Sequence, residues 1–186
     1  MLGNEHFEVL FAEHFGVHRS FFAGKRILDI GCGPRGSLEW ASDTSRRVGS
    51  DPLVDAYSEF GIDLHAIEYM ADPVEHLSSA YGSFDVVSSL NSLDHVDDLA
   101  RAMSEIARVL VPGGSLLLEV EFGHSPTPAE PIEIPADFAA SLAPVFTIAS
   151  VNQFGLSSGH QVHRAHTKKI PYRSHGVEPQ VCSSLT

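Results

Sequence analysis

Short apolar runs alternate along this chain with segments whose apolar residues recur every three or four positions. Runs rich in β-branched residues and bounded by glycine, proline or acidic residues are typical of buried strands. We predict such strands over residues 27–30, 47–53, 64–69, 84–90 and 115–121. The polar residues that follow each run then lie at the strand ends, where a parallel sheet presents its functional groups.

Helical spacing fills the intervals between these strands. The clearest helix is expected over residues 97–110, because Leu99, Met103 and Ile106 share one face and Pro112 stops it. Further helices are expected over residues 5–22 with Gly16 as the end, from Ser37 to about Asp43, and over 54–60, 73–80 and 134–142. Strands alternating with helices predict the α/β class, a parallel sheet with helices on both faces.

The pattern thins beyond residue 122. Residues 124–135 hold four prolines and predict a loop, a candidate lid over the site. Residues 145–151 and 161–166 look like two last strands, and 168–186 like a loose tail. We therefore expect a helical lead-in over 1–24, one domain over 25–167, and the tail over 168–186.

Composition excludes several classes. The chain has 186 residues, and 43% of them are hydrophobic, which suits one globular domain. A formal net charge of −12 argues against a nucleic-acid partner, because phosphate binding needs a basic stripe. The start shows no secretory signal and no apolar run is long enough to span a bilayer, so we expect no membrane association and a cytoplasmic location.

The most informative feature is a glycine-rich turn after the first predicted strand. Gly31, Gly33 and Gly36 allow the main chain to approach a ligand closely. Such a turn occurs in several nucleotide-binding folds. Asp29, just before the glycines, would repel a pyrophosphate but attract an ammonium or sulfonium group. The alternative is that Asp29 orders the turn or caps the following segment.

Several other residues carry chemistry with a plainer alternative beside it. His95 follows the fourth strand and could accept a proton from a hydroxyl or cap the helix near Asp97; His124 could do the former or be an ordinary loop histidine. One of Glu119 and Glu121 could line a pocket or face solvent. Cys32 is expected to be a packing residue rather than a nucleophile. We expect no zinc site at His160, His163 and His166, because their spacing does not place them on one side of a strand.

Four segments in order resemble class I S-adenosylmethionine-dependent methyltransferases. They are Ile27-Leu-Asp-Ile-Gly-Cys-Gly-Pro, Val48-Gly-Ser-Asp51-Pro-Leu, the run from Phe84 through Asn91 to Val96, and Arg108-Val-Leu-Val-Pro-Gly-Gly-Ser-Leu-Leu-Leu. The resemblance covers about residues 25–121. It implies a Rossmann-like three-layer sandwich with a mostly parallel sheet of about seven strands, the last antiparallel. Arg35 stands where the family pattern has glycine, and it could point into solvent or reach toward a substrate carboxylate.

The resemblance also implies roles for particular residues. Asp51 would hold the ribose hydroxyls, although Pro52 after it also fits a helix N-cap. The residues implied in cofactor binding are Asp29, Gly31, Cys32, Gly33, Asp51, Pro52, Asp72, Val74, Leu90 and Asn91. The implied cofactor is S-adenosylmethionine with no metal, and the implied reaction is methyl transfer to a small-molecule oxygen or nitrogen by in-line displacement. A catalytically silent cofactor-binding or regulatory protein stays open, as does an NAD-dependent oxidoreductase, which Asp29 and Pro112-Gly-Gly disfavour.

Overall fold

A computed structural model describes residues 4–155 and 161–169 of the chain. Its centre is one seven-stranded sheet in the order β3-β2-β1-β4-β5-β7-β6. The strands are β1 (Arg26–Ile30), β2 (Arg46–Ser50), β3 (Glu68–Met70), β4 (Phe84–Leu90), β5 (Leu110–Phe122), β6 (Phe146–Gly155) and β7 (Gln161–Lys169). Strands β1 to β5 pair in parallel, and β7 is antiparallel to both β5 and β6. This confirms the predicted α/β class and a mostly parallel sheet whose last strand is antiparallel.

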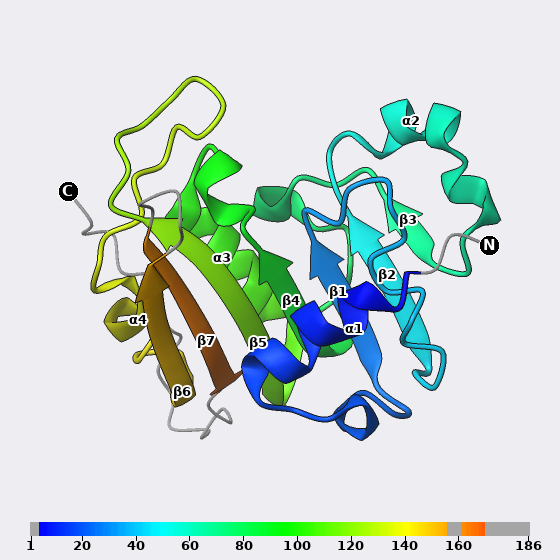
Figure 1. Cartoon of the computed structure of the whole chain (residues 1–186), viewed down its shortest axis with the longest axis horizontal. Coiled ribbons are helices and arrows are strands. Elements are labelled where there is room, and N and C mark those ends of the chain that lie inside the picture. The colour runs from blue at the N-terminus through cyan, green and yellow to red at the C-terminus, as the bar shows by residue number, and fades with distance from the viewer. Residues whose placement is uncertain (1–3, 156–160, 170–186) are drawn as a thin grey trace.

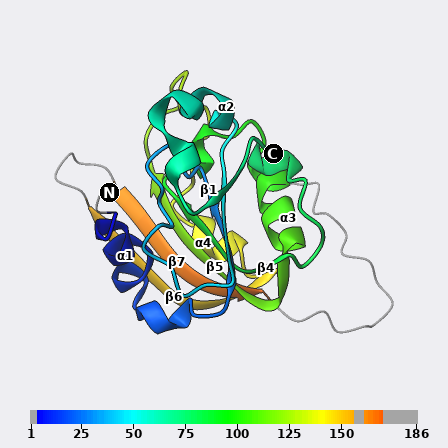
Figure 2. The same cartoon turned by 90° about the vertical axis from the view of Figure 1, so that its right-hand side faces the viewer.

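Two hydrophobic clusters lie on the two faces of the sheet. On one face, α3 (Leu99–Val109) and α4 (Phe138–Ser141) pack against alternate strand residues such as Leu28 and Val87. On the other, the N-terminal α1 (His6–Phe11) covers Ile27 and Val86 together with the buried Trp40. Seen edge-on, α1 and α3 lie on opposite sides of the strands (Figure 2). The layering fits the predicted three-layer sandwich.

The helix expected from Ser37 does not form, and that prediction is wrong. Residues 37–45 make turns instead, in which Glu39 and Ala41 donate to carbonyls three residues back, at 3.0 and 3.1 Å. Leu38, Trp40 and Ala41 are all buried. Because residues 38 and 40 lie on opposite sides of a helix, one helix face could not bury both. The chain gives up helical periodicity to bury these side chains against the sheet.

The predicted helix over 73–80 shrinks to one 3₁₀ turn, Val74–His76. Backbone groups that a helix would pair internally are taken by side chains. The Arg108 guanidinium donates to the carbonyls of Leu77 and Ser79, both at 2.7 Å, and Glu105 accepts the Leu77 N–H at 3.2 Å. Tertiary hydrogen bonds replace helical ones here.

The other helices are shorter than their apolar spacing suggests. The lead-in expected over 5–22 consists of α1, then the 3₁₀ turns Glu13–Phe15 and Arg19–Phe21, and Gly16 interrupts it at a φ of +66°. The helix expected over 54–60 is α2 (Val54–Tyr57) extended by the 3₁₀ turn Ser58–Phe60. A further 3₁₀ turn, Ile62–Leu64, occupies the start of the predicted third strand. The segment predicted as helix over 134–142 forms only α4.

The predicted C-terminal strand pair is present as the β6–β7 hairpin. Lys168 and Lys169, expected in the tail, belong to β7, and residues 170–186 lie outside the described residues. His160 and the side chain of His163 also lie outside them, so the zinc expectation there stays a prediction. Among the described residues, no helix has both the length and the apolar character needed to cross a membrane.

Candidate active site

The carboxyl ends of β1, β2, β4 and β5 meet at one edge of the sheet, which lies uppermost in Figure 1. The glycine-rich turn after β1 occupies its centre. Gly31 and Gly33 have φ values of +69° and +59°, and the Gly31 N–H donates to the Ser50 carbonyl at 2.9 Å. A Cβ on Gly31 would lie 2.4 Å from the Cβ of Ser92. The turn is therefore packed between the end of β2 and the segment after β4, with no room for a side chain at Gly31.

Asp51 joins this turn to the one after β2. One carboxylate oxygen accepts the Gly33 N–H at 3.2 Å, and the other accepts the Leu53 N–H at 3.0 Å, an Asx-type turn. The N-cap of α2 is Leu53, so the helix-capping alternative for Asp51 is replaced by this turn-ordering role. Burial, together with the nearby Asp51 carboxylate, raises the pKa of Tyr57 to about 12. Asp51 holds two turns in register and remains close to the sheet edge.

Asp29 lies beneath the turn, with only 3% of its surface exposed. Its carboxylate accepts hydrogen bonds from the Ser37 hydroxyl at 2.5 Å and from the Ser88 hydroxyl at 2.9 Å. Burial raises the pKa of Asp29 to about 7, and Asp51 adds to the rise, while the two serine hydrogen bonds oppose it. The turn-ordering reading of Asp29 is thus present in the structure. A group poised near neutral pH is also sensitive to a nearby ligand charge.

Cys32 packs inside the turn. A Cβ on Gly49 would lie 2.7 Å from the Cys32 sulfur, so this side chain fills the space above β2. Burial, reinforced by Asp29 and Asp51, raises the pKa of the thiol well above its usual range. The thiol is therefore protonated and a poor nucleophile, which agrees with the packing role predicted from the sequence.

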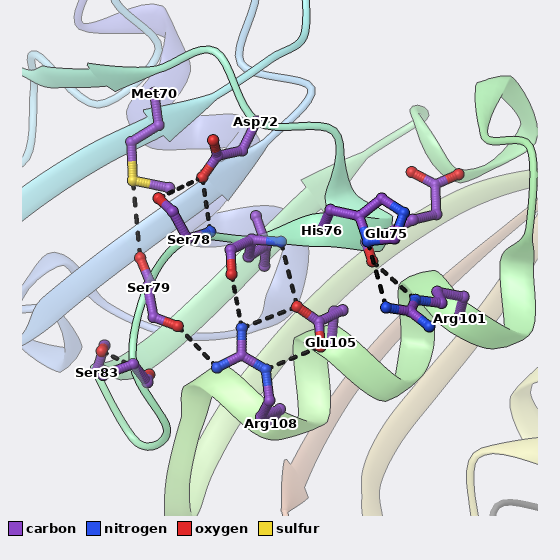
Figure 3. A network of polar contacts seen from close by, with 12 residues as sticks. Met70, Asp72, Glu75, His76, Ser78, Ser79, Ser83, Arg101, Glu105 and Arg108 are labelled. Carbon is purple, nitrogen blue, oxygen red and sulfur yellow. Dashed lines mark hydrogen bonds and ion pairs between the residues drawn. The ribbon is translucent and has the colours of Figure 1, made fainter.

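A polar network fixes the loop after β3, which carries Asp72 and Val74. Asp72 accepts from both the N–H and the hydroxyl of Ser78, at 2.8 and 2.6 Å, while Val74 is buried in the core. Glu75, buried beside it, accepts the N–H of Asp97 at 2.8 Å just before α3. Figure 3 shows this loop held against α3 by Arg101, Glu105 and Arg108. These contacts fix the side of the loop that faces α3.

The turn after β4 begins in a left-handed backbone conformation. Asn91 has a φ of +52°, a value that few residues other than glycine adopt. Its N–H donates to the Glu119 carbonyl at 2.8 Å, and its side-chain oxygen accepts the Glu121 N–H at 3.3 Å. Leu90, just before it, is half-buried. This turn faces the glycine-rich turn across the ends of β1 and β4.

Beside it lies a cluster that the sequence analysis found only in part. Asp94, 2% exposed, stands between the two histidines singled out earlier: its carboxylate oxygens lie 3.7 Å from Nε2 of His95 and 3.7 Å from Nε2 of His124. Glu130 lies beside Asp94 and His95, with candidate ligand atoms of the three within 4.8 Å of one another. The available signal for Asp94 was an acidic residue between Leu93 and His95.

Two open sequence alternatives can be placed. The Arg35 side chain is exposed, and its carbonyl accepts a hydrogen bond from the Asn4 amide at 2.7 Å. The solvent-facing reading of Arg35 is therefore the one seen. Glu119 forms an ion pair with Arg164 of β7 at 2.5 Å, so its carboxylate supports the β5–β7 pairing.

A separate cavity of about 610 Å³ lies near the β3 edge of the sheet. It is lined by residues of α2, the turn after it and the approach to β3, among them Ile62, His65 and Tyr69. None of the residues implied in cofactor binding lines it. This cavity lies beside α2 and is separate from the site at the centre of the sheet.

The sequence of this chain matches a known protein family and several curated proteins. A family model described as a methyltransferase domain matches residues 28–118. A ubiquinone biosynthesis O-methyltransferase of Sinorhizobium medicae is 36% identical over 119 residues, which cover 58% of this chain and 46% of that protein. The chain thus spans about half the length of the curated relatives it matches.

Solved structures show the same fold at low identity. The [4+2]-cyclase SpnF has a TM-score of 0.70 and 19% identity, with 90% of this chain and 81% of that one covered. A 1,6-didemethyltoxoflavin-N1-methyltransferase of Burkholderia thailandensis, crystallised with S-adenosylhomocysteine, has a TM-score of 0.66 and 18% identity, covering 90% and 79%. These similarities establish the fold. The two proteins are named for different activities, so the fold alone does not specify a reaction.

Proposed function

We propose that this chain, whose residues 28–118 belong to the methyltransferase-domain family, transfers a methyl group from S-adenosylmethionine to a small-molecule acceptor. The observation that carries the proposal is the bond between two turns: Asp51 holds the Gly33 N–H while the buried Asp29 braces the turn from below. Cofactor contacts in an open parallel sheet lie at this edge. The hydrogen bonds of Asp51 and Asp29 thereby form an acidic cradle at this edge.

Each turn has a part in this proposal. The glycine-rich turn would bind the methionyl end, whose ammonium group suits the negative potential around Asp29. Asp51 would accept the ribose hydroxyls with the lone pairs left over from its backbone contacts. The loop after β3 would face the adenine, and the turn after β4 the methyl group. The proposed cofactor residues are those implied by the family: Asp29, Gly31, Cys32, Gly33, Asp51, Pro52, Asp72, Val74, Leu90 and Asn91.

Oxygen is the better supported acceptor atom. The curated relative from Sinorhizobium medicae is named for O-methylation, while the toxoflavin enzyme that shares the fold is named for N-methylation. The sulfonium is already activated, so the protein's main task is to align the acceptor, the methyl carbon and the sulfur. A hydroxyl acceptor also loses a proton, and His95 and His124 are the candidate groups beside the turn after β4. The net charge of −12 favours a small molecule over a nucleic acid.

Calorimetric titration tests the cofactor half of this proposal. S-adenosylmethionine should bind and NAD should not. The Asp51→Asn variant should bind more weakly, while Asp137→Asn, which removes an exposed carboxylate from the residue before α4, should match the wild type. If S-adenosylmethionine does not bind at millimolar concentration, the proposal fails.

Turnover tests the second half. Transfer of labelled methyl from S-adenosylmethionine to phenols and catechols would establish the enzyme, and a comparison with amines would fix the acceptor atom. Binding without transfer to any of them would favour the silent, regulatory alternative. A cytoplasmic location stays a prediction from the sequence.

A further inference from the structure

We infer that Asp94, His95 and Glu130 form a binding site for one divalent transition-metal ion, and that the ion fastens the loop over residues 123–135 to the turn after β4. The site does not depend on the proposed methyl transfer. It rests on the buried Asp94 carboxylate, which faces two imidazole nitrogens and a second carboxylate.

Hydrogen bonding fixes which histidine nitrogens are free. Nδ1 of His95 lies 2.7 Å from the Ala129 carbonyl, and Nδ1 of His124 lies 3.2 Å from the Ser125 carbonyl. A carbonyl only accepts, so each Nδ1 carries the proton in the neutral ring. Nε2 of each ring then presents a lone pair, and both lone pairs face Asp94.

Asp94 needs a positive charge from elsewhere. Among the described residues, its Oδ1 and the Nε2 of His124 are buried and make no hydrogen bond. An ionised carboxylate in this position is costly unless it is paired or binds a metal. The separations of 3.7 Å are too long for a direct hydrogen bond. Two ligands of one tetrahedral ion with bonds of about 2.0–2.2 Å lie about 3.3–3.6 Å apart. The Asp94–His95 pair is within a few tenths of an ångström of that separation, and the ligand atoms of Asp94, His95 and Glu130 all lie within 4.8 Å of one another.

A metal ion fits the cluster better than a second proton does. A proton on one imidazole would satisfy Asp94 alone, whereas Glu130 brings a second carboxylate to the same point. One imidazole with two carboxylates suits a first-row ion such as Zn²⁺ or Mn²⁺ better than Mg²⁺. The His95 Nδ1–H bond to a backbone carbonyl is the outer contact that metal-bound histidines commonly make.

The cluster joins two parts of the chain that are far apart in sequence. Asp94 and His95 belong to the 3₁₀ turn Leu93–His95 after β4, and Glu130 to the proline-rich loop after β5. The Ile132 N–H already donates to the Asp94 carbonyl at 3.2 Å. In Figure 1 this loop rises above the carboxyl edge of the sheet. An ion held between them fastens this loop over the carboxyl edge of the sheet.

Metal titration of the full chain tests the site. In a non-chelating buffer, the wild type should bind Zn²⁺ with one more equivalent than Glu130→Gln or Asp94→Asn, or at least about tenfold more tightly at that equivalent. Glu133→Gln is the matched control, because Glu133 is exposed on the same loop. It should bind as the wild type does, and Mg²⁺ should bind more weakly than Zn²⁺.

Limited proteolysis with proteinase K provides a readout that activity does not supply. Zn²⁺ should slow cleavage within residues 124–133 in the wild type and in Glu133→Gln, but not in Glu130→Gln. The inference is overturned if the wild type binds no Zn²⁺, or if Glu130→Gln and Asp94→Asn bind it with the affinity and stoichiometry of the wild type. Either result would leave the S-adenosylmethionine titration untouched, so the two proposals fail separately.

Discussion

Asp29 and Asp94 are both buried carboxylates at the same edge of one sheet, with 3% and 2% of their surfaces exposed. Their surroundings are opposite. Asp29 accepts hydrogen bonds from the hydroxyls of Ser37 and Ser88, so donors from its own chain reach both of its oxygens. Asp94 faces two imidazole nitrogens and a second carboxylate, which accept hydrogen bonds when the imidazoles are neutral and the carboxylate is ionised.

This contrast separates a framework from a binding site. The turn above Asp29 is ordered by groups of its own chain: glycines set its shape, and Asp51, just after β2, accepts the Gly33 N–H. The cluster at Asp94 is electrostatically complete only when a cation joins it. Burial alone therefore does not reveal the role of a carboxylate. The hydrogen-bond donors around it indicate whether it orders the chain or binds a cation.

Substitution of Gly31 is the most direct test of whether the glycine-rich turn is a structural framework. Gly31→Ala should lower the free energy of unfolding by about 3 kcal/mol, from a left-handed backbone that costs about 1–2 kcal/mol and a Cβ placed 2.4 Å from Ser92. Gly33→Ala shares the positive φ but meets nothing within 4 Å, so it should cost only about 1–2 kcal/mol. Urea denaturation of both variants measures the difference. Equal losses would mean that Ser92 does not confine the turn.

Much of that framework could be predicted from the sequence. Strand and turn signals are local: the β-branched run of β4 and Gly82 before it carry their own backbone preferences, and β4 has the predicted bounds Phe84–Leu90. The need for glycine at positions 31 and 33 follows from the same local logic, because both residues adopt a positive φ and Gly31 also has no room for a Cβ.

Tertiary contacts explain what the sequence did not predict. The helix expected from Ser37 fails because Leu38 and Trp40 are both drawn into the core, and the helix over 73–80 fails because Arg108 captures its carbonyls. These competitors lie elsewhere in the chain, so no local pattern reveals them. Asp94 was missed for the same reason, since its meaning depends on a histidine and a glutamate that the loop after β5 brings back to it.

A second experiment tests whether the framework serves the cofactor. Asp51→Asn should weaken S-adenosylmethionine binding by roughly 1–3 kcal/mol, the scale of lost hydrogen bonds to a charged group. The amide oxygen can still accept one of the two backbone N–H bonds, so the fold should survive. Calorimetry with Asp137→Asn as the control measures the change. An unaltered affinity would show that the residue orders the turns and does nothing for the ligand.

The protonation of Asp29 supplies a third test. Because its pKa is about 7 in the folded chain and ordinarily 3.8, the folded chain holds a proton that the unfolded chain has lost between about pH 4 and 7. The free energy of unfolding therefore falls as pH rises through this window, by at most about 1.4 kcal/mol per pH unit, and levels off above it. The Asp29→Asn variant lacks this contribution. Subtracting its stability from that of the wild type, measured by denaturation from pH 5 to 8, isolates the effect, and parallel curves would refute it.

The smallest predicted effect is an increase in stability, whereas Gly31→Ala is predicted to decrease it. It tests the contrast between Asp29 and Asp94 most sharply. In the presence of a chelator at pH 8, Asp94→Asn should raise the free energy of unfolding by about 1 kcal/mol, since the carboxamide buries no charge and can donate an N–H to a histidine Nε2. Thermal denaturation measures this shift. Added Zn²⁺ should then stabilise the wild type and not the variant, because an ion that binds only the folded chain raises its stability. If the variant is less stable than the wild type in chelator, the Asp94 carboxylate is already stabilised by its own chain, as that of Asp29 is, and the contrast between the two residues fails.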